Sequence, residues 1–96
     1  MKDIQLTLAK IESLLVTTIR PSFLSVTEEK DNIPHILIVV SHPNFRYFSF
    51  QQRVSRIYSL LTNHLYDTIE ERTVIVQAYD DTEMGEIIEG YHISHE

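Results

Sequence analysis

The sequence has no cysteine and only two glycines. Without thiols, the chain by itself cannot form a disulfide, a thiolate metal site or a thiol redox centre. Two glycines are too few for a glycine-rich loop that cradles phosphates. No apolar run approaches the roughly eighteen residues that a membrane-spanning helix needs. Acidic and polar residues interrupt residues 1–12, where a signal peptide is continuously apolar. We therefore expect a cytoplasmic protein that does not act on membranes.

Basic residues are also scarce, since 8 lysines and arginines stand against 14 aspartates and glutamates and the net charge is −6. A domain whose main task is to hold phosphates is usually basic, so this balance argues against dedicated nucleic-acid binding but leaves room for a local basic stripe. The length of 96 residues, 43% of them hydrophobic, suits one domain with a small core. We expect an ordered core over about residues 3–89 and a flexible tail over residues 90–96.

Hydrophobic periodicity predicts three helices and three strands. Apolar residues spaced by three and four predict a helix over residues 4–19, with Asp3 as its N-cap and Pro21 just beyond its end. Alternation and β-branched residues predict strands at residues 23–27, 35–40 and 73–79. A loop at 45–50 leads into a second amphipathic helix, and residues 67–72 form a polar connection. A short third helix is expected at 83–88, with residues 80–82 as its cap.

This order of elements favours an α+β fold. The first two strands are close in sequence and are expected to form a hairpin, and the third strand joins them through a helical crossover. The economical arrangement is a small three-stranded mixed sheet with helices packed on one face and a more polar opposite face.

The second predicted helix carries two arginines whose role the pattern leaves open. Arg53, Arg56 and Leu60 are expected on an exposed stripe roughly 100° or more from the apolar face. Such a stripe is often only a solvated surface. Arginine beside apolar surface is also typical of hot spots that bind protein partners. A set made of Arg46, Tyr47, Arg53 and Arg56 would instead suit nucleic acid, because arginines contact phosphates and aromatic rings stack on bases.

No arrangement of residues indicates catalysis or a resident metal ion. The serines have no oxyanion loop or nucleophile elbow around them, and the paired acids fit a turn and a helix cap. His92 and His95 are spaced as a helical ion site would require, but they fall in the predicted tail. His35 and His42 are seven residues apart and so point to opposite faces of a regular strand. We expect a protein that is not an enzyme and has no cofactor in isolation.

Several segments together resemble the BolA-like protein family. The segment IESLLVTTIRPSFLSVTEE at residues 11–29 resembles the family's first helix and strand, and FQQRVSRIYSLLTNHL at 50–65 resembles its Phe-x-x-Arg-His-Arg-x-Ile-Tyr-x-x-Leu helix. The strand that ends at Ser41 and the segment VIVQAY fit the second and third strands. The similarity covers roughly residues 11–79 and depends on the order and spacing of these segments.

The resemblance implies a fold of the order αββα(α)βα, related to the type II KH arrangement. It implies an adaptor that partners a monothiol glutaredoxin in iron–sulfur cluster trafficking and the stress response. Alternatively it implies a DNA-binding transcriptional regulator. The Gly-x-x-Gly loop by which KH domains clamp a nucleic-acid backbone is absent from this sequence, as it is from the family.

Two departures from the family's pattern affect the implied site. Arg53-Val54-Ser55 stands in place of Arg-His-Arg, with Arg56 one position later. Arg72 stands where the family has a histidine that ligates the cluster, and a guanidinium has no lone pair to offer a metal. His35 is then the remaining candidate ligand for a [2Fe-2S] cluster shared with a glutaredoxin that supplies the thiolates. A divergent member with a different protein partner is a third hypothesis.

Overall fold

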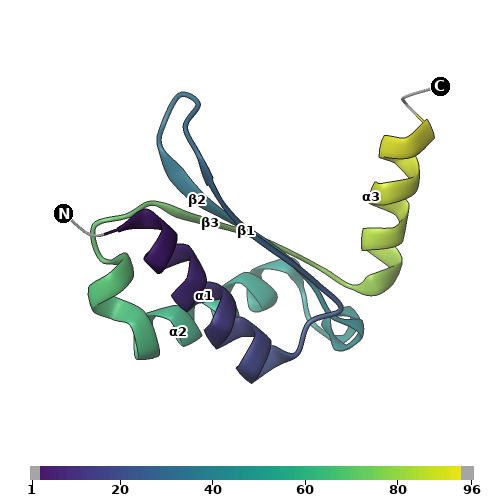
Figure 1. Cartoon of the computed structure of the whole chain (residues 1–96). Coiled ribbons are helices and arrows are strands. Elements are labelled where there is room, and N and C mark those ends of the chain that lie inside the picture. The colour runs from purple at the N-terminus through teal and green to yellow at the C-terminus, as the bar shows by residue number, and fades with distance from the viewer. Residues whose placement is uncertain (1–2, 94–96) are drawn as a thin grey trace.

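The computed structural model describes the backbone of residues 3–93 and the side chains of residues 3–89. Its elements follow the predicted order (Figure 1). They are α1 (Ile4–Ile19), β1 (Phe23–Glu29), β2 (His35–Ser41), the short 3-10 helix η1 (Pro43–Tyr47), α2 (Phe50–Ile69), β3 (Val74–Tyr79) and α3 (Asp81–Ile93). Within the described residues, none of the helices has the length and apolar character to cross a bilayer.

Helix α1 begins and ends where the sequence predicts. The Asp3 side chain accepts a hydrogen bond from the Gln5 amide at 2.9 Å, which satisfies one of the free donors at the start of the helix. The helix ends at Arg20, whose φ of 54° is left-handed, directly before Pro21. A left-handed residue at this position breaks the helical hydrogen-bond pattern, and the proline cannot restore it.

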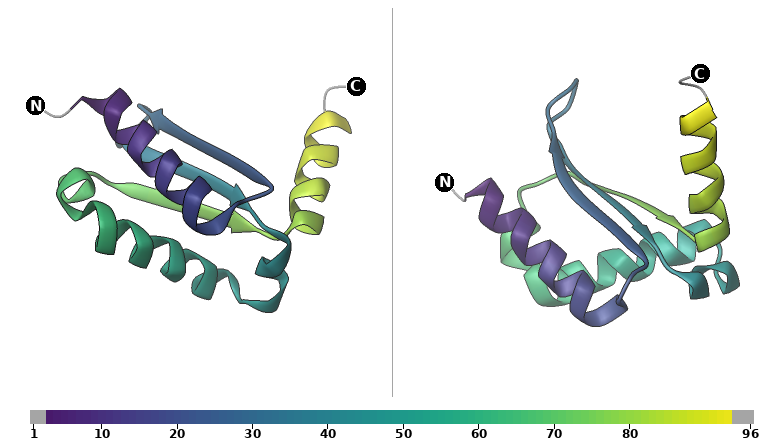
Figure 2. Two further views of the ribbon diagram at one scale, coloured as in Figure 1. Left: turned by 60° about the horizontal axis from the view of Figure 1, so that its bottom comes forward. Right: turned by 45° about the vertical axis from the view of Figure 1, so that its right-hand side comes forward.

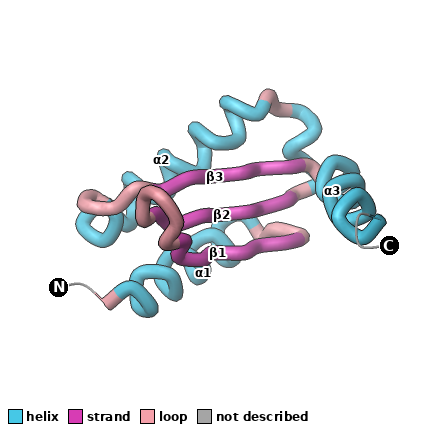
Figure 3. The backbone as a smooth tube through the Cα atoms, turned by 90° about the horizontal axis from the view of Figure 1, so that it is seen from above, coloured by secondary structure: helices cyan, strands magenta, loops and turns pink. Residues whose placement is uncertain are grey.

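The three strands form the predicted mixed sheet, in the order β1-β2-β3 (Figure 3). Strands β1 and β2 form an antiparallel hairpin from Phe23↔Ser41 to Glu29↔His35. Strand β3 pairs parallel to β2, with Val74 opposite Ile36 and Tyr79 opposite Ser41. A parallel pair requires a long crossover, and helix α2 provides it.

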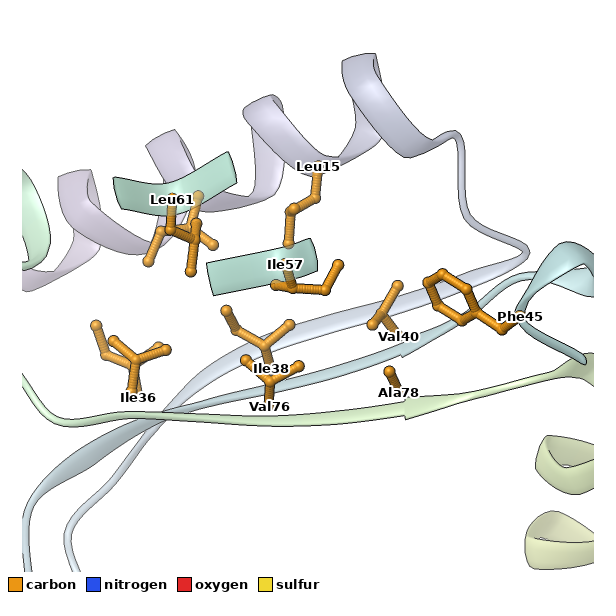
Figure 4. Packing of buried hydrophobic residues seen from close by; sticks show 11 residues of the cluster. Leu15, Ile36, Ile38, Val40, Phe45, Ile57, Leu61, Val76 and Ala78 are labelled. Atoms are coloured by element: carbon orange, nitrogen blue, oxygen red, sulfur yellow. The ribbon is translucent and has the colours of Figure 1, made fainter. Parts of the chain in front are cut away.

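Helices α1 and α2 cover one face of the sheet (Figure 2). The buried core lies between them, and alternate residues of β2 and β3 point into it (Figure 4). Its fully enclosed members include Ile11, Leu15, Ile36, Ile38, Val40, Ile57, Leu61 and Ala78. The opposite face is more polar along β1, as expected. It still presents the half-buried Leu37 and Val39 and the 41%-exposed Ile75.

Helix α2 is longer than predicted and begins with a capping box. The Ser49 side chain accepts from the Gln52 amide, and the Gln52 side chain accepts from the Ser49 amide. The helix continues to Ile69 through a non-helical residue, Leu65, at φ −133° and ψ 27°. The polar residues after Leu65 were predicted to be a connection because they interrupt the apolar stripe, but polarity alone does not end a helix.

Helix α3 also extends beyond its predicted end. Asp80 is the predicted cap: its carboxylate accepts from the Glu83 amide, and Glu83 accepts from the Asp80 amide, each at 2.8 Å. The backbone remains helical to Ile93, and residues 94–96 of the predicted tail lie outside the described part. Helix α3 stands at the end of the sheet and projects away from the layer formed by α1 and α2 (Figures 1 and 3), and its first turn contacts the start of α2 through the Arg53–Glu83 pair.

Candidate functional site

The residues predicted to carry function lie at opposite ends of the sheet. His35 opens β2, whereas η1 and the start of α2 follow its last residue, Ser41. Six residue steps of about 3.3 Å place these two ends about 20 Å apart. We call them the histidine end, around His35, and the arginine end, around Arg46, Arg53 and Arg56. Helix α2 runs back from the arginine end toward the histidine end (Figure 2).

Arg53 does not lie on an exposed stripe, and that prediction was wrong. Its side chain is only 7% exposed. The physical reason is the helical period: Arg53 is four residues before Ile57 and therefore only about 40° from it around the helix. Ile57 is fully buried, so Arg53 lies beside the core-facing stripe.

The buried guanidinium of Arg53 joins three segments. Nε donates to the Phe48 carbonyl at 3.0 Å, and Nη1 donates to the Ala78 carbonyl at 3.2 Å and to Glu83 Oε1 at 2.7 Å. These bonds connect the entrance to α2, the end of β3 and the first turn of α3. Glu83, which supplies the compensating charge, is far away in sequence, and no local pattern indicates it. Arg53 is therefore a positioning residue of the arginine end.

Arg56 and Arg46 remain on the surface, each against an aromatic ring. The guanidinium carbon of Arg56 lies 5.2 Å from the centre of the Phe48 ring, and that of Arg46 lies 4.8 Å from the centre of the Tyr47 ring. Arg46 also donates to the Tyr47 hydroxyl at 2.6 Å. Neither arginine forms an ion pair with a described side chain. Their charges are available to a partner.

Leu60 is less exposed than predicted. It is half-buried and packs against the core cluster, so it presents only part of its side chain beside Arg56. The structure describes neither the side chain of His92 nor any part of His95. His64 is exposed on α2.

A cavity of about 370 Å³ opens beside Arg56, between the last turn of α1 and η1. Its lining includes Ile19, His42, Asn44, Phe45, Phe48 and Arg56. His42 Nδ1 accepts from the Asn44 amide at 3.0 Å, so a neutral ring carries its proton on Nε2, which is then a donor. One signal in the sequence indicates a surface without negative charge here, and it was missed. Residues 32–66 include no aspartate or glutamate, although the chain has 14 of these acids.

The histidine end has a smaller hollow of about 160 Å³, lined by His35 with Glu28, Glu71 and Arg72 among others. His35 Nδ1 lies 2.8 Å from the Ile33 carbonyl oxygen. A carbonyl only accepts, so Nδ1 carries the proton, and the neutral ring keeps a lone pair on Nε2. Metal-ligating histidines are commonly held in this way by a carbonyl.

The chain alone does not complete a metal site at this end. No group of three or more potential ligand side chains is gathered among the described residues. His35 can therefore offer one ligand, in a hollow that Arg72 lines together with Glu28 and Glu71.

Solved structures of BolA proteins superpose on this chain. The BolA domain of SufE1 from Arabidopsis thaliana matches with a TM-score of 0.65 at 21% identity, over 79% of this chain and 93% of its own. BolA1 from Mus musculus matches with a TM-score of 0.68 at 20% identity, over 83% and 69% of the two chains. A Bol-like protein from Babesia bovis matches with a TM-score of 0.66 at 15% identity, over 82% and 90%.

This chain has the BolA fold. No protein-family model and no curated protein matches the sequence itself. The BolA fold confirms the predicted three-stranded mixed sheet with helices on one face, and it is the fold that the resemblance implied. Function still depends on the residues that this chain places at the two ends of its sheet.

Proposed function

We propose that this protein is a BolA-like adaptor that binds a monothiol glutaredoxin and takes part in iron–sulfur cluster trafficking in the cytoplasm, as part of a stress response. The BolA fold supports the family, and one observation carries the proposed chemistry: the Ile33 carbonyl fixes the His35 ring with Nε2 free. In this proposal His35 contributes one ligand to a [2Fe-2S] cluster, and the thiolates come from the glutaredoxin, because the chain has no cysteine.

The residues at the histidine end fit one ligand to such a cluster. Imidazole replaces thiolate on one iron in some [2Fe-2S] proteins, so a single histidine added to a partner's thiolates is chemically reasonable. What this chain does is orient one imidazole through the Ile33 carbonyl, in a hollow that Arg72 lines together with Glu28 and Glu71. It acts as a binding module and not as an enzyme.

The partner's contact surface is proposed along helix α2. A helix of 20 residues is about 30 Å long, which is comparable to the diameter of a small protein. A glutaredoxin lying along α2 can therefore contact Arg56 and the exposed part of Leu60 and still reach the loops around His35. Arg53 takes part only indirectly, because it positions Phe48 and the first turn of α3.

The test uses His35→Asn and a matched control, His64→Ala. The asparagine amide can still donate to the Ile33 carbonyl but has no imine nitrogen for a metal. Wild-type protein mixed with cluster-loaded glutaredoxin is expected to elute as a complex on gel filtration and to alter the visible absorption and circular dichroism of the cluster. His64→Ala is expected to do the same. His35→Asn should lose the spectral change. If wild-type protein gives neither a complex nor a spectral change, the proposal is wrong.

DNA binding is the second candidate, and the two arginine–aromatic pairs favour it. The structure leaves fewer residues to contact DNA than the sequence predicted, because Arg53 is buried and already donates to the Ala78 carbonyl. Arg46, Tyr47 and Arg56 remain. Two phosphate contacts predict a slope of about −2 when the logarithm of affinity is plotted against that of salt concentration, and Arg46→Gln should remove about one unit of this slope. A labelled duplex that does not bind even at low salt would exclude this candidate.

A further inference from the structure

The cavity beside Arg56 combines a cation with an apolar floor. The apolar residues of its lining are Phe45, which is only 5% exposed, the half-buried Phe48, and Ile19 from the last turn of α1. A volume of about 370 Å³ is at the lower end of the range for ligand sites. It is large enough for one or two side chains and too small for a folded element.

We propose that this cavity at the arginine end binds an acidic peptide segment of a partner protein, with an apolar side chain in the cavity and the adjacent carboxylate on Arg56. The proposal rests on the proposed function, because it assigns chemistry to the α2 surface on which the glutaredoxin is placed. It also names the property that the partner's contact segment must have.

The charges and hydrogen-bond donors around this cavity favour a carboxylate as its ligand. The guanidinium carbon of Arg56 lies 5.2 Å from the centre of the Phe48 ring, a cation–π contact that uses none of its N–H donors, so that they are available for a bidentate bond with a carboxylate. Residues 32–66 contain no aspartate or glutamate that could pair with Arg56 in place of a partner's carboxylate. No described carboxylate pairs with Arg56 either. His42, whose Nε2 is a donor, lines the same cavity.

A carboxylate fits this surface better than a phosphate. The last turn of α1, at Thr18 and Ile19, lines the cavity, and the C-terminal end of a helix carries partial negative charge. The net charge of the chain is also −6. A single negative charge beside Arg56 is tolerated there, whereas a doubly charged phosphate is repelled more strongly. The apolar side chain then occupies the part of the cavity next to Ile19.

The site is rigid before any partner arrives. Arg53 donates to the Phe48 carbonyl at 3.0 Å, and its guanidinium lies 6.0 Å from the centre of the Phe45 ring. The Phe48 amide in turn donates to the Phe45 carbonyl. The two rings are therefore fixed by a buried residue, and less conformational entropy is lost when a ligand binds.

Two matched dipeptides provide the test. They are N-acetyl-Asp-Phe-amide and its neutral counterpart N-acetyl-Asn-Phe-amide, titrated into isotope-labelled full-length protein and followed by NMR. The aspartyl probe should bind with millimolar affinity and shift resonances of Ile19, Asn44, Phe48 and Arg56. The asparaginyl probe should bind about tenfold or more weakly, because a charge-assisted hydrogen bond contributes roughly 1.5–3 kcal/mol.

Variants at Arg56 and Arg46 complete the design. Arg56→Gln should lose about tenfold or more in affinity for the aspartyl probe, and Arg56→Lys should lose part of it because it cannot bond bidentately. Arg46→Gln is the control, since Arg46 does not line the cavity, and it should bind as wild type does. Unchanged NMR spectra elsewhere confirm that each variant is folded.

Three outcomes would overturn the inference: equal binding of both dipeptides, shifts confined to residues outside the cavity, or preferential binding of inorganic phosphate or a single-stranded dodecamer at Arg56. The last outcome would favour nucleic acid over protein. Failure of the proposed function is seen separately, because the dipeptides require no glutaredoxin. If the dipeptides bind as expected but no cluster complex forms, the cavity serves a different acidic partner.

Discussion

The arginine end and the histidine end of the sheet are built in different ways. At the arginine end, one buried guanidinium connects the segment between η1 and α2 to β3 and α3, and the Ser22 hydroxyl donates to Asp81 at 3.0 Å, which holds the start of α3 against the start of β1. At the histidine end, α2 is interrupted at Leu65, and each ion pair of the β1–β2 turn has one exposed partner: Lys30 pairs with Glu28 at 3.6 Å, and Asp31 pairs with His35 at 3.8 Å. Buried polar bonds fix local geometry far more firmly than exposed ion pairs do. The difference suits a preformed cavity at the arginine end and a single oriented imidazole beside a less firmly held turn at the histidine end.

The largest expected effect on stability comes from Arg53→Met, which removes the buried hydrogen bonds of the arginine end. Methionine fills similar volume but leaves the Phe48 and Ala78 carbonyls without their donor and Glu83 without its cation. We expect a loss of about 2–3 kcal/mol in the free energy of unfolding, discounted for the 45% exposure of the Glu83 side chain. Urea unfolding followed by circular dichroism measures it.

Arg56→Met is the matched control, on the same helix and one turn away. Its guanidinium is exposed and forms no described ion pair, so the expected change is within about 0.5 kcal/mol. Hydrogen exchange should also become faster in the first turn of α3 in Arg53→Met and not at the β1–β2 turn. Equal destabilisation by the two variants would show that Arg53 does not hold this end together.

A smaller effect is expected at the histidine end from Tyr58→Phe. The Tyr58 hydroxyl donates to the Val74 carbonyl and so connects α2 to the start of β3. Removing it should cost about 1 kcal/mol at neutral pH, as measured by urea unfolding. Burial also raises the pKa of Tyr58 above its ordinary value of 10, because the phenolate is poorly solvated there.

The same tyrosine predicts a dependence on alkaline pH. The folded state holds the Tyr58 proton more tightly than the unfolded state does. Its contribution to stability is therefore complete below pH 10 and is lost as the pH rises through the raised pKa of the folded state. Stability of the wild type should fall more steeply above pH 10 than that of Tyr58→Phe. Parallel curves for the two proteins would contradict this role.

Local signals in the sequence were sufficient for the fold and insufficient for the site. The periodicity of α1, the Asp3 cap and the β-branched run of β2 depend on neighbours in the chain, and each of them was predicted correctly. The position of Arg53 beside the core-facing stripe follows from its spacing to Ile57, but its charge partner Glu83 could not be predicted, because it is 30 residues away in the sequence and only the fold brings it close. The cavity beside Arg56 was missed for the same reason, since α1, η1 and α2 each contribute to it.

The smallest expected effect on stability, from His35→Asn, separates folding from ligand binding. The Asn side-chain amide replaces Nδ1–H as donor to the Ile33 carbonyl, and only the part of the ring beyond it is lost. The His35 side chain is 13% exposed, so some packing is also removed, and the free energy of unfolding should fall by about 0.5 kcal/mol. Urea unfolding measures this change beside the spectral test with cluster-loaded glutaredoxin. A variant that loses the spectral change while it keeps its stability and its complex on gel filtration would assign the imidazole to the cluster. A variant that loses several kcal/mol would show that His35 is needed for the hairpin itself, and the histidine end would then resemble the arginine end in being held by a buried polar side chain.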